Sequence, residues 1–584
     1  MKRITQIPMI VFILLMATTV FATPHDFKSI TINKPPIRFA ILGDRTGGHV
    51  DHVYEEIVAE VEEMKPDFVM TVGDQIEGYT EDAATLNKQW DEYFEIVKPL
   101  TMPLYITPGN HDITTDAAEP VYFDRVGKPN YTFDVNNYHF IVLDVSRWEK
   151  SSELSHQQLQ WLIYDLMSHK DAAKTLVFFH KPFWYNTVSL DKPDTLHSLF
   201  VNFGVDAVFN GHFHSYFSAR HDGIIYTAVG SSGGDTGPLP HDLDFQFTWV
   251  TLTDSTIDIA PIKKGAIRKW DMMTDVDLHL VDEIAQMAIS FPAPLRLPKD
   301  LKVKSAKVQV QLDNITNFSA VDTLRWSSDS NWTITPQTLP VEFKPGQSQV
   351  VEFDFSCNGT PFPLPEASID FPYGENKLAP VATALRATRQ AIAVTVSKAP
   401  VIDGKLDDAC WSNPITHLFS EDESKPVEAT LVYFAHDKDN LYIAARCGES
   451  KMDSIRDYFN MRDGGVYGED CFGIFLQPDL KNDTAYQIYF NPIGTIFDQR
   501  LDPSGSAYLG DKAWNGKYES KVIKCADGWN VEAKIPLKQF GIMEKSGMQM
   551  GINPVRKQKR LNNAAAWQLP RDYNPRTFGV LTLQ

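Results

Sequence analysis

The sequence predicts a multidomain chain in which an α/β domain is followed by two β-sandwiches. The chain has 584 residues, which is more than one ordinary domain uses. Up to about residue 290, strand-like and helix-like segments alternate, which is typical of a sheet-centred α/β domain. Beyond Phe291-Pro292-Ala293-Pro294 the segments read as short strands, which favours sandwiches for the rest of the chain.

The first domain opens with a strand, a helix and a second strand. Ile37–Leu42 is an apolar run typical of a buried strand. Residues 51–64 place apolar side chains at helical spacing and stop before Pro66, and Asp67–Val72 is the next apolar run. Further along, residues 134–144 read as a hairpin with its turn at Asn136-Asn137.

The middle of the chain predicts an immunoglobulin-like β-sandwich that serves as a spacer. Short strands such as Ala306–Leu312 and Val350–Phe355 recur, and we find no convincing helix. We place this spacer at residues 295–395. We see no residue pattern in it that carries chemistry.

Polar side chains follow five apolar segments of the first domain. They lie in the sequences Gly43-Asp44, Gly73-Asp74, Gly109-Asn110-His111-Asp112, His180 and Gly211-His212-Phe213-His214. In an open α/β sheet, sites form where strands reach their carboxyl ends. Carboxylate, amide and imidazole ligands that converge there bind divalent metals, and two adjacent ions can clamp an in-line displacement at phosphorus.

These elements, in this order over about residues 37–265, resemble the calcineurin-like metallophosphoesterase family. The resemblance implies a domain over residues 30–290 with a β-sandwich core and flanking helices. It also implies two divalent metal ions, Mn, Fe or Zn. The ligands carried over from the family motif are Asp44, Asp74, Asn110, His180, His212 and His214.

The sequence departs from the family pattern at one ligand position. The family has His two residues after the first Asp, and here that residue is Thr46. Three interpretations stay open: water completes the site around a harder ion such as Mn²⁺, His49 moves in across Gly47-Gly48, or the site is degenerate.

The resemblance also implies roles in hydrolysis of phosphate mono- or diesters by a metal-bound hydroxide. The Asn110 amide would stabilise charge on the phosphoryl oxygens, and His111 would protonate the leaving oxygen with Asp112 orienting it. Arg45 would offer a fork to a phosphate oxygen, or would be a solvated loop cation.

One position bears on the subfamily. Purple acid phosphatases need Tyr three residues after the bridging Asp, where this chain has Glu77, and Tyr79 is two positions too far. We therefore expect the chain to lie nearer to bacterial phosphodiesterase-like and phosphatase-like members.

Residues 398–584 resemble the family 9 carbohydrate-binding module. The resemblance rests on Ile402-Asp403-Gly404-Lys405, Asp470-Cys471-Phe472-Gly473 and Gly528-Trp529-Asn530-Val531, among other strand-and-turn sequences. It implies a β-sandwich that binds sugars by aromatic stacking.

The tryptophans of this segment divide by their surroundings. Trp529 lies in a strand rich in apolar residues and is expected in the core, and Trp411 is expected to pack behind the first turn. Trp514 precedes Asn515-Gly516, which is loop composition, so it is the candidate sugar-stacking residue, with Tyr518 as a second wall. The alternative is that Trp514 only covers the edge of the sandwich.

The start of the chain predicts export. Lys2 and Arg3 precede an apolar run from about Ile7 to Phe21, and Ala22 offers a small-residue cleavage site. We predict a cleaved signal peptide over residues 1–22, a location in the periplasm, outside the cell or at its surface, and no stable membrane insertion. The alternative is a membrane anchor, but the run is shorter than the roughly 20 residues that span a bilayer.

The net charge bears on possible partners, and the cysteine positions bear on the core. Lys and Arg number 55 against 75 Asp and Glu, a net charge of −20, which argues against nucleic acid as a partner. Cys447 and Cys471 lie in apolar strand-like runs, so we expect buried free thiols there.

The sequence therefore predicts an exported metal-dependent phosphoesterase. Its substrate would be a phosphorylated small molecule or a phospho-glycan, and its last domain would bind carbohydrate. The alternative is a glycan-binding surface protein whose phosphoesterase fold is a degenerate scaffold. The sequence does not distinguish monoesters from diesters.

Overall fold

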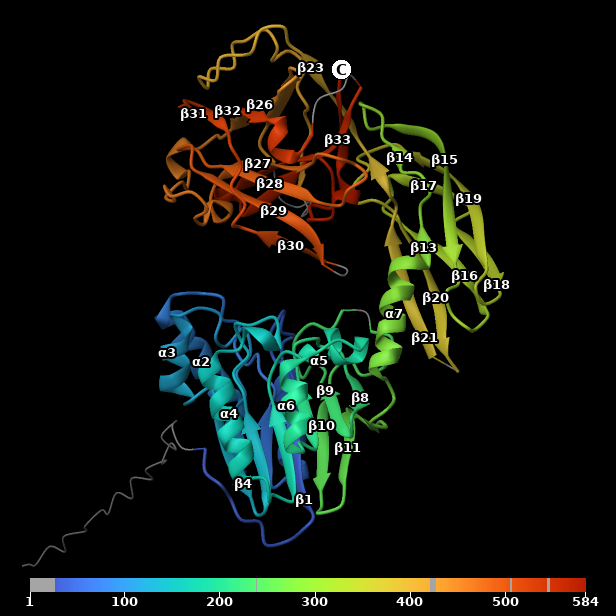
Figure 1. The fold of residues 1–584 in the computed structure, drawn as a ribbon. Helices are drawn as coiled ribbons and strands as arrows, with labels where there is room; N and C mark the ends of the chain where they lie inside the picture. The colour runs from blue at the N-terminus through green and yellow to red at the C-terminus, as the bar shows by residue number, and fades with distance from the viewer. Residues whose placement is uncertain (1–26, 238, 376, 421–426, 505–506, 543–546) are drawn as a thin grey trace, which may run out of the picture. The chain divides into compact units, whose positions relative to one another are not determined.

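The computed structural model describes residues 27–237, 239–375, 377–420, 427–504, 507–542 and 547–584. The predicted signal peptide, residues 1–22, lies outside the described residues. The chain divides into two compact units, Met1–Val281 and Asp282–Gln584, with the boundary inside helix α7 (Figure 1). Within the described part of the chain, no helix combines the length and apolarity that a bilayer crossing requires.

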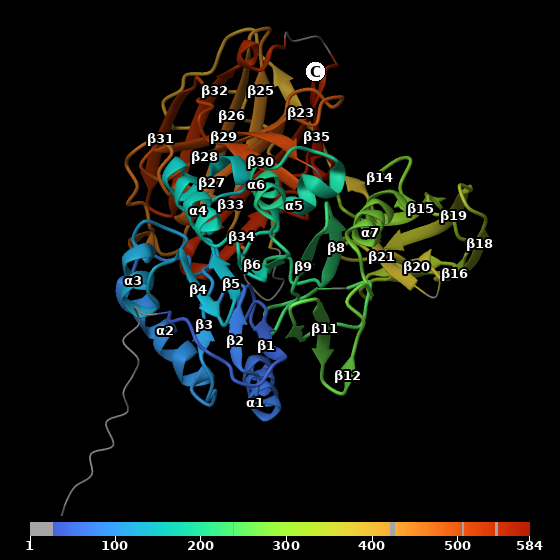
Figure 2. The same cartoon turned by 60° about the horizontal axis from the view of Figure 1, so that its bottom comes forward.

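The first unit is built on two six-stranded sheets. The first has the order β12-β11-β10-β1-β2-β3, with β1 (Ile37–Leu42), β2 (Phe68–Thr71), β3 (Leu104–Tyr105), β10 (Phe247–Leu252), β11 (Ile257–Lys263) and β12 (Ala266–Ile267). The second has the order β4-β5-β6-β7-β9-β8, with β4 (Tyr131–Val135), β5 (Tyr138–Val142), β6 (Lys174–Phe178), β7 (Ala207–Asn210), β8 (Phe217–His221) and β9 (Ile224–Ala228). Strands β1, β2 and β3 are parallel neighbours (Figure 2), as are β5, β6, β7 and β9.

Helices lie outside both sheets. They are α1 (Val53–Met64), α2 (Ala83–Val97), α3 (Ala118–Arg125), α4 (His156–Ser168), α5 (Phe183–Asn186), α6 (Thr195–Phe203) and α7 (Asp275–Met287), with 3₁₀ turns at Ser151–Glu153 and Val188–Leu190. Apolar residues of α1, α2 and α3 form one cluster with the outer face of the first sheet. Helices α4 and α6 lie along the second sheet (Figure 1).

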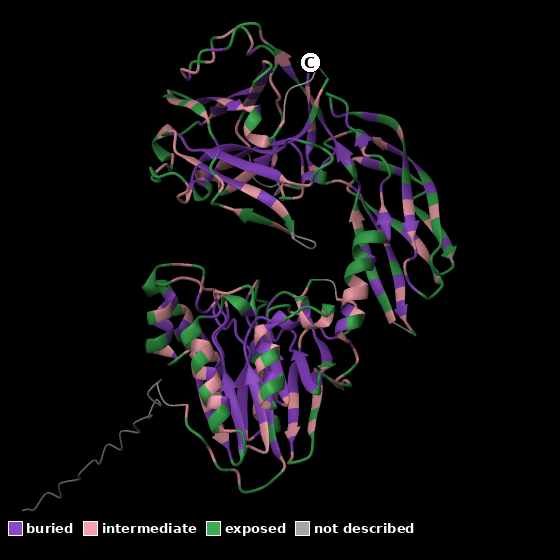
Figure 3. Ribbon diagram, viewed as in Figure 1, coloured by how far each residue is buried: buried purple, intermediate pink, exposed green. Residues whose placement is uncertain are grey.

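Strand β1 shows how one sequence serves two cores. Successive side chains of a strand point to opposite faces of its sheet. Ile37, Phe39 and Ile41 belong to the core between the two sheets, whereas Ala40 and Leu42 pack against the helices. The result is a β-sandwich with flanking helices, as predicted, and its central strands are buried on both faces (Figure 3).

The prediction of one open sheet edge needs a correction. All five strands that precede the polar residues form, but β1, β2 and β3 belong to one sheet while β6 and β7 belong to the other. Their carboxyl ends meet across the sandwich, because the His180 ring after β6 bonds to the carbonyl of Val72 after β2. The sequence pattern does not reveal which sheet a strand joins.

The first part of the second unit contains two four-stranded sheets, β13-β15-β19-β17 and β18-β16-β20-β21. Their bounds are β13 (Ile289–Ser290), β15 (Val303–Asp313), β16 (Ala320–Ser327), β17 (Trp332–Thr335), β18 (Thr338–Phe343), β19 (Ser348–Cys357), β20 (Glu366–Gly374) and β21 (Lys377–Ala384). Trp326 of one sheet meets Phe355 of the other edge-on, with ring centroids 4.9 Å apart. The described residues between 295 and 395 contain no helix, as predicted; the immunoglobulin-like assignment stays a prediction.

The last part of the chain folds into sheets that share strand β23. Its strands are β23 (Gln390–Thr395), β24 (Phe419–Ser420), β25 (Thr430–His436), β26 (Asn440–Gly448), β27 (Cys471–Gln477), β28 (Ala485–Phe490), β29 (Ile496–Ser504), β30 (Ala507–Asp511), β31 (Glu519–Cys525), β32 (Gly528–Pro536), β33 (Gln549–Gln558), β34 (Asn563–Ala566) and β35 (Gly579–Leu583). The short pair β14 (Leu295–Arg296) and β22 (Ala387–Thr388) forms a separate ladder. Single 3₁₀ turns lie at Met452–Ser454, Val466–Gly468, Leu537–Phe540, Lys559–Leu561 and Pro575–Thr577.

This sandwich bears out the core assignments and shifts one boundary. Trp529 and Trp411 are buried, and Cys447 and Cys471 are buried free thiols. Strand β23 pairs with β35 and β25, so residues from Gln390 onward belong to this sandwich and not to the spacer.

Candidate metal centre

Three of the polar residues that follow the strands have strained backbone conformations. Asp74, His212 and His214 have φ angles of 60°, 76° and 53°, in the left-handed region that side chains rarely adopt. Such strain persists only where the surrounding structure imposes it, and it concentrates at functional sites.

Two glycines allow backbone to approach the carboxylates closely. A Cβ at Gly109 would lie 2.2 Å from Asp74 Oδ1, and one at Gly211 would lie 2.3 Å from Asp44 Oδ1. Any larger residue at either position would displace a carboxylate. This explains why glycine precedes Asn110 and His212 in the sequence.

Carboxylates and imidazoles meet in two groups. His180 Nε2 lies 3.0 Å from Asp74 Oδ2, and Asp74, His180 and His212 each offer a ligand atom within 4.8 Å of the others. His214 Nε2 lies 3.3 Å from Asp44 Oδ2. The structure thus brings together five of the six predicted ligands, Asp44, Asp74, His180, His212 and His214.

Backbone carbonyls orient two of the imidazoles. His180 Nδ1 lies 2.8 Å from the Val72 carbonyl, and His214 Nδ1 lies 2.5 Å from the Asp235 carbonyl. A carbonyl only accepts, so Nδ1 carries a proton in each ring, and Nε2 is the nitrogen that faces the carboxylates and would bind a metal ion after losing its own proton. This carbonyl–imidazole arrangement is the usual support of metal-binding histidines.

Two buried oxygens of the centre have no hydrogen-bond donor among the described residues: Asp44 Oδ1 and Asn110 Oδ1. Buried polar atoms are nearly always paired, so each calls for a partner. The carboxylates also dominate the local electrostatics: the attraction of Asp74 and Asp44 outweighs burial and raises the pKa of His180 to about 9. Oxygen and imidazole donors gathered around these carboxylates fit a pair of divalent ions.

His212 is held in the state that a ligand needs. Burial and the neighbouring His180 lower its pKa to about 3. The ring is therefore neutral over the physiological range, with a nitrogen lone pair free for coordination.

Neither Thr46 nor His49 contributes to the first metal position in this structure. Thr46 is buried, and its hydroxyl donates to the Ile76 carbonyl at 2.8 Å. His49 Nδ1 lies 2.8 Å from Glu77 Oε1. The arrangement fits the interpretation in which Asp44, Asp74 and His214 are the protein ligands of that ion.

The predicted role of Asp112 is wrong. Its carboxylate accepts from the backbone N–H groups of four residues, Asp74, Gln75, Ile76 and Gly109. His111 is instead oriented by the Glu77 carbonyl, 2.8 Å from its Nδ1. Asp112 therefore shapes the loop that presents Asp74, a role that sequence spacing does not reveal.

Both predictions for Arg45, a phosphate-binding fork and a solvated loop cation, are also wrong. The side chain is buried, and its guanidinium donates to the Gln75 carbonyl at 3.0 Å and to the Glu92 carboxylate. A guanidinium held by these two partners is neither a phosphate fork nor a solvated cation.

One residue that the sequence analysis set aside lies at the centre. The side-chain N–H of Asn110 donates to the Tyr79 hydroxyl at 2.9 Å. The Tyr79 ring also meets the His111 ring edge-on, with centroids 4.5 Å apart. The sequence prediction excluded Tyr79 because it lies five residues after Asp74 and not three. The left-handed backbone at Gly78 turns the loop back, so Tyr79 still reaches Asn110 and His111.

The predicted sugar-binding aromatics of the last domain are partly engaged. Trp514 is half-buried against Tyr486 and Phe540, with ring centroids 4.5 and 6.2 Å away. The Tyr518 hydroxyl donates to Asp498 at 2.9 Å, and the Arg462 guanidinium lies over its ring. Trp514 and Tyr518 are each still partly exposed to solvent, so their role in sugar binding stays a prediction.

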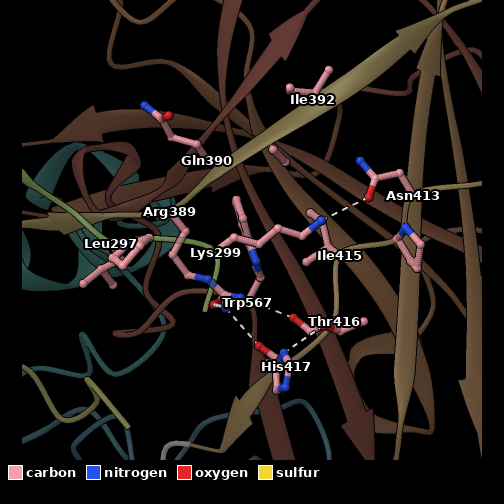
Figure 4. Close-up of a pocket in the computed structure, with 13 residues that line it drawn as sticks. Leu297, Lys299, Arg389, Gln390, Ile392, Asn413, Ile415, Thr416, His417 and Trp567 are labelled. Carbon is pink, nitrogen blue, oxygen red and sulfur yellow. Dashed lines mark hydrogen bonds between the residues drawn. The ribbon is translucent and has the colours of Figure 1, made fainter. Parts of the chain in front are cut away.

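The second unit also contains a cavity of about 180 Å³ beside Arg389 (Figure 4). The buried guanidinium donates to the backbone carbonyls of Thr416, His417 and Trp567. Its central carbon, Cζ, also lies 4.9 Å from the centroid of the Trp567 ring, over the ring face. With its donors used in this way, Arg389 joins segments of the sandwich and does not offer an anion site.

Comparison with known families agrees with the two resemblances. The calcineurin-like phosphoesterase family model matches residues 37–216. The carbohydrate family 9 binding domain-like model matches residues 402–584. The chain therefore carries a phosphoesterase domain and a family 9 sandwich, with neither match covering half of its length.

Among curated proteins, purple acid phosphatase 15 of Arabidopsis thaliana is 23% identical over 36% of this chain and 48% of its own length. The human serine/threonine-protein phosphatase CPPED1 is 29% identical over 31% of this chain and 63% of its own length. The chain thus spans about half to two thirds of these relatives. These similarities do not decide the subfamily, so the expectation drawn from Glu77 stays a prediction.

Among solved structures, a family 9 carbohydrate-binding module from Caldicellulosiruptor kristjanssonii, in complex with cellotriose, is 17% identical. The match covers 33% of this chain and 93% of that one, with a TM-score of 0.26.

Proposed function

We propose that the protein is an exported metal-dependent phosphoesterase that hydrolyses phosphate mono- or diesters. The observation that carries the proposal is the grouping of Asp74 with His180 and His212 and of Asp44 with His214, while Asp44 Oδ1 and Asn110 Oδ1 are buried without a donor among the described residues. The family match and the phosphatase relatives support the reaction class.

The chain's own residues would divide the work. Divalent ions held by these ligands would supply Lewis-acid activation of water and of the phosphoryl group. Asp74 Oδ2 lies 3.0 Å from His180 Nε2, and Asp74 Oδ1 accepts from the His111 backbone N–H; by the family resemblance this carboxylate would be the ligand shared by both ions. His111 Nε2 lies 4.0 Å from Asp74 Oδ2 and faces the centre, where it can protonate the leaving oxygen.

For the substrate we propose a phosphorylated small molecule or a phospho-glycan, and for the family 9 sandwich we propose carbohydrate binding. The proposal of export rests on the charged and apolar start of the sequence. A glycan-binding protein with an inert scaffold is the outcome to test against.

The decisive experiment is turnover of p-nitrophenyl phosphate and of bis(p-nitrophenyl) phosphate with added Mn²⁺ or Zn²⁺. We expect hydrolysis that a chelator abolishes. Asp74→Ala should retain less than about a tenth of wild-type turnover, because a shared ligand contributes several kcal/mol of transition-state stabilisation. Tyr164→Phe, a change on the exposed face of α4, should match the wild type. Absence of turnover with every metal would contradict the proposal and favour the inert scaffold.

A further inference from the structure

Tyr79 is held over the metal centre by an unusual turn. Gly78 and Tyr79 both have left-handed backbone, with φ angles of 57° and 48°. A Cβ at Gly78 would lie 1.7 Å from the His111 carbonyl oxygen, so only glycine lets this loop press against His111. The turn brings Tyr79 beside Asn110 and His111 while 60% of its surface stays exposed.

The hydrogen bond to Asn110 sets the direction of that amide. Asn110 Nδ2 donates to the Tyr79 hydroxyl, and Asn110 Oδ1 is buried with no donor among the residues that the structure describes. With the amide in this orientation its oxygen, and not its N–H group, is available to a cation. Tyr79 is thus a positioning residue for a metal ligand.

The same bond leaves the proton of Tyr79 unused. A phenol has one O–H donor and also accepts, and Asn110 occupies an acceptor position. Within the described ranges no acceptor takes the Tyr79 O–H. An exposed donor beside Asn110 and His111, the residues that the proposed function puts next to the phosphoryl group, is placed for a ligand oxygen.

We propose that the Tyr79 hydroxyl donates a hydrogen bond to a phosphoryl oxygen of the substrate. The inference rests on the proposed phosphoesterase function and adds a substrate-binding residue to it. The hydroxyl would then make two hydrogen bonds: it accepts one from the Asn110 amide, which positions a metal ligand, and it donates one to the phosphate.

The test is calorimetric titration of inorganic phosphate into the full chain saturated with Mn²⁺. Tyr79→Phe removes the hydroxyl and keeps the ring against His111. We expect its Kd for phosphate to rise about tenfold or more, since a hydrogen bond to a charged group is involved. Tyr164→Phe, which removes an equally exposed hydroxyl on α4, should bind phosphate as the wild type does.

A parallel Mn²⁺ titration separates phosphate binding from metal binding. We expect Tyr79→Phe to change Mn²⁺ affinity much less than phosphate affinity. An unchanged Kd for phosphate, or a loss fully explained by weaker Mn²⁺ binding, would overturn the inference.

The result can be told apart from failure of the proposed function. Phosphate binding that depends on Tyr79, in a protein that hydrolyses no ester, would defeat the proposed function alone. Hydrolysis and phosphate binding that are both unaffected by Tyr79→Phe would defeat the inference alone. A wild-type chain that binds no phosphate in the presence of Mn²⁺ would defeat both.

Discussion

At the scale of single residues, the carboxylate of Asp112 tests what holds the centre in shape. Asp112→Asn replaces one acceptor oxygen by an NH₂ group that faces backbone N–H donors. We expect the free energy of unfolding to fall by about 2–4 kcal/mol, as for a buried network left partly unsatisfied. Urea unfolding measures it.

His111→Gln is the matched control for this change. It alters the neighbouring side chain without touching the amides that Asp112 binds, so turnover should fall while stability stays near the wild-type value. If Asp112→Asn instead lowered turnover alone, the orienting role for Asp112 would be restored.

Thr46 allows a second test at this scale. Thr46→Val keeps the shape of the side chain and removes the hydroxyl that donates to the Ile76 carbonyl. We expect Mn²⁺ affinity to change less than threefold, because the hydroxyl is turned to the backbone, and stability to fall by about 1 kcal/mol. Asp44→Asn should weaken Mn²⁺ binding strongly. A large loss of affinity in Thr46→Val would make the hydroxyl a ligand.

Sequence reasoning succeeded at residues whose role depends on type and order. Asp44, Asp74 and His180 follow strands that it placed correctly, so their convergence could be anticipated. It failed for Arg45, Asp112 and Tyr79, because the direction of each side chain depends on the path of a loop. That path turns on left-handed residues such as Tyr79 itself, which no local pattern reveals.

At the scale of elements, His139 ties the hairpin β4–β5 to helix α4. Its ring nitrogens lie 2.8 Å from Asp134 Oδ1 and 2.7 Å from Asp165 Oδ2. The His169 ring stacks on it at 3.7 Å. Burial opposes its protonation, but the hydrogen bonds to Asp165 and Asp134 outweigh burial and raise the pKa of His139.

A raised pKa in the folded state fixes the sign of the pH dependence. The contribution to stability is fully present below the unfolded pKa of about 6.5 and is lost as pH rises through the folded value. The difference in unfolding free energy between wild type and His139→Gln should therefore be larger at pH 5.5 than at pH 9. Urea unfolding at both values measures it, and a difference that does not vary with pH would exclude the protonated bridge.

Elements were easier to predict than their partners. Strand β1 and the turn between β4 and β5 lie where the sequence placed them. Strand β23 was assigned to the spacer but pairs with β25 and β35. An alternating strand carries the same pattern in either sandwich, and its neighbours are settled by packing between distant segments.

At the scale of the whole molecule, the cysteines provide a check on both parts of the second unit. Cys357, Cys447 and Cys471 are buried, whereas Cys410 and Cys525 are partly accessible, and all five are free thiols. Burial raises the pKa of Cys447 and Cys471 to about 11 and about 12. We expect Ellman's reagent to detect at most Cys410 and Cys525 in the native chain and all five thiols after denaturation. Fast reaction of more than two thiols would show a looser sandwich.

Carbohydrate binding can also be measured on the full chain. Calorimetry with soluble oligosaccharides should show weak binding, and Trp514→Ala should abolish it. Tyr458→Ala, which changes a side chain that is 78% exposed elsewhere on the same sandwich, serves as the comparison. Equal effects of both changes, or none from Trp514→Ala, would remove Trp514 from the binding surface.

The origin of the ligands in two sheets has a consequence for how the protein acquires activity. Asp44, Asp74 and Asn110 follow strands of one sheet, and the three histidines follow strands of the other. Ions bound between them would cross-link the two sheets, and this cross-link could form only after the sheets have packed together. A chain whose sheets fail to pack would therefore bind no metal and be inactive, so the amount of metal bound per chain would report the fraction of correctly folded protein.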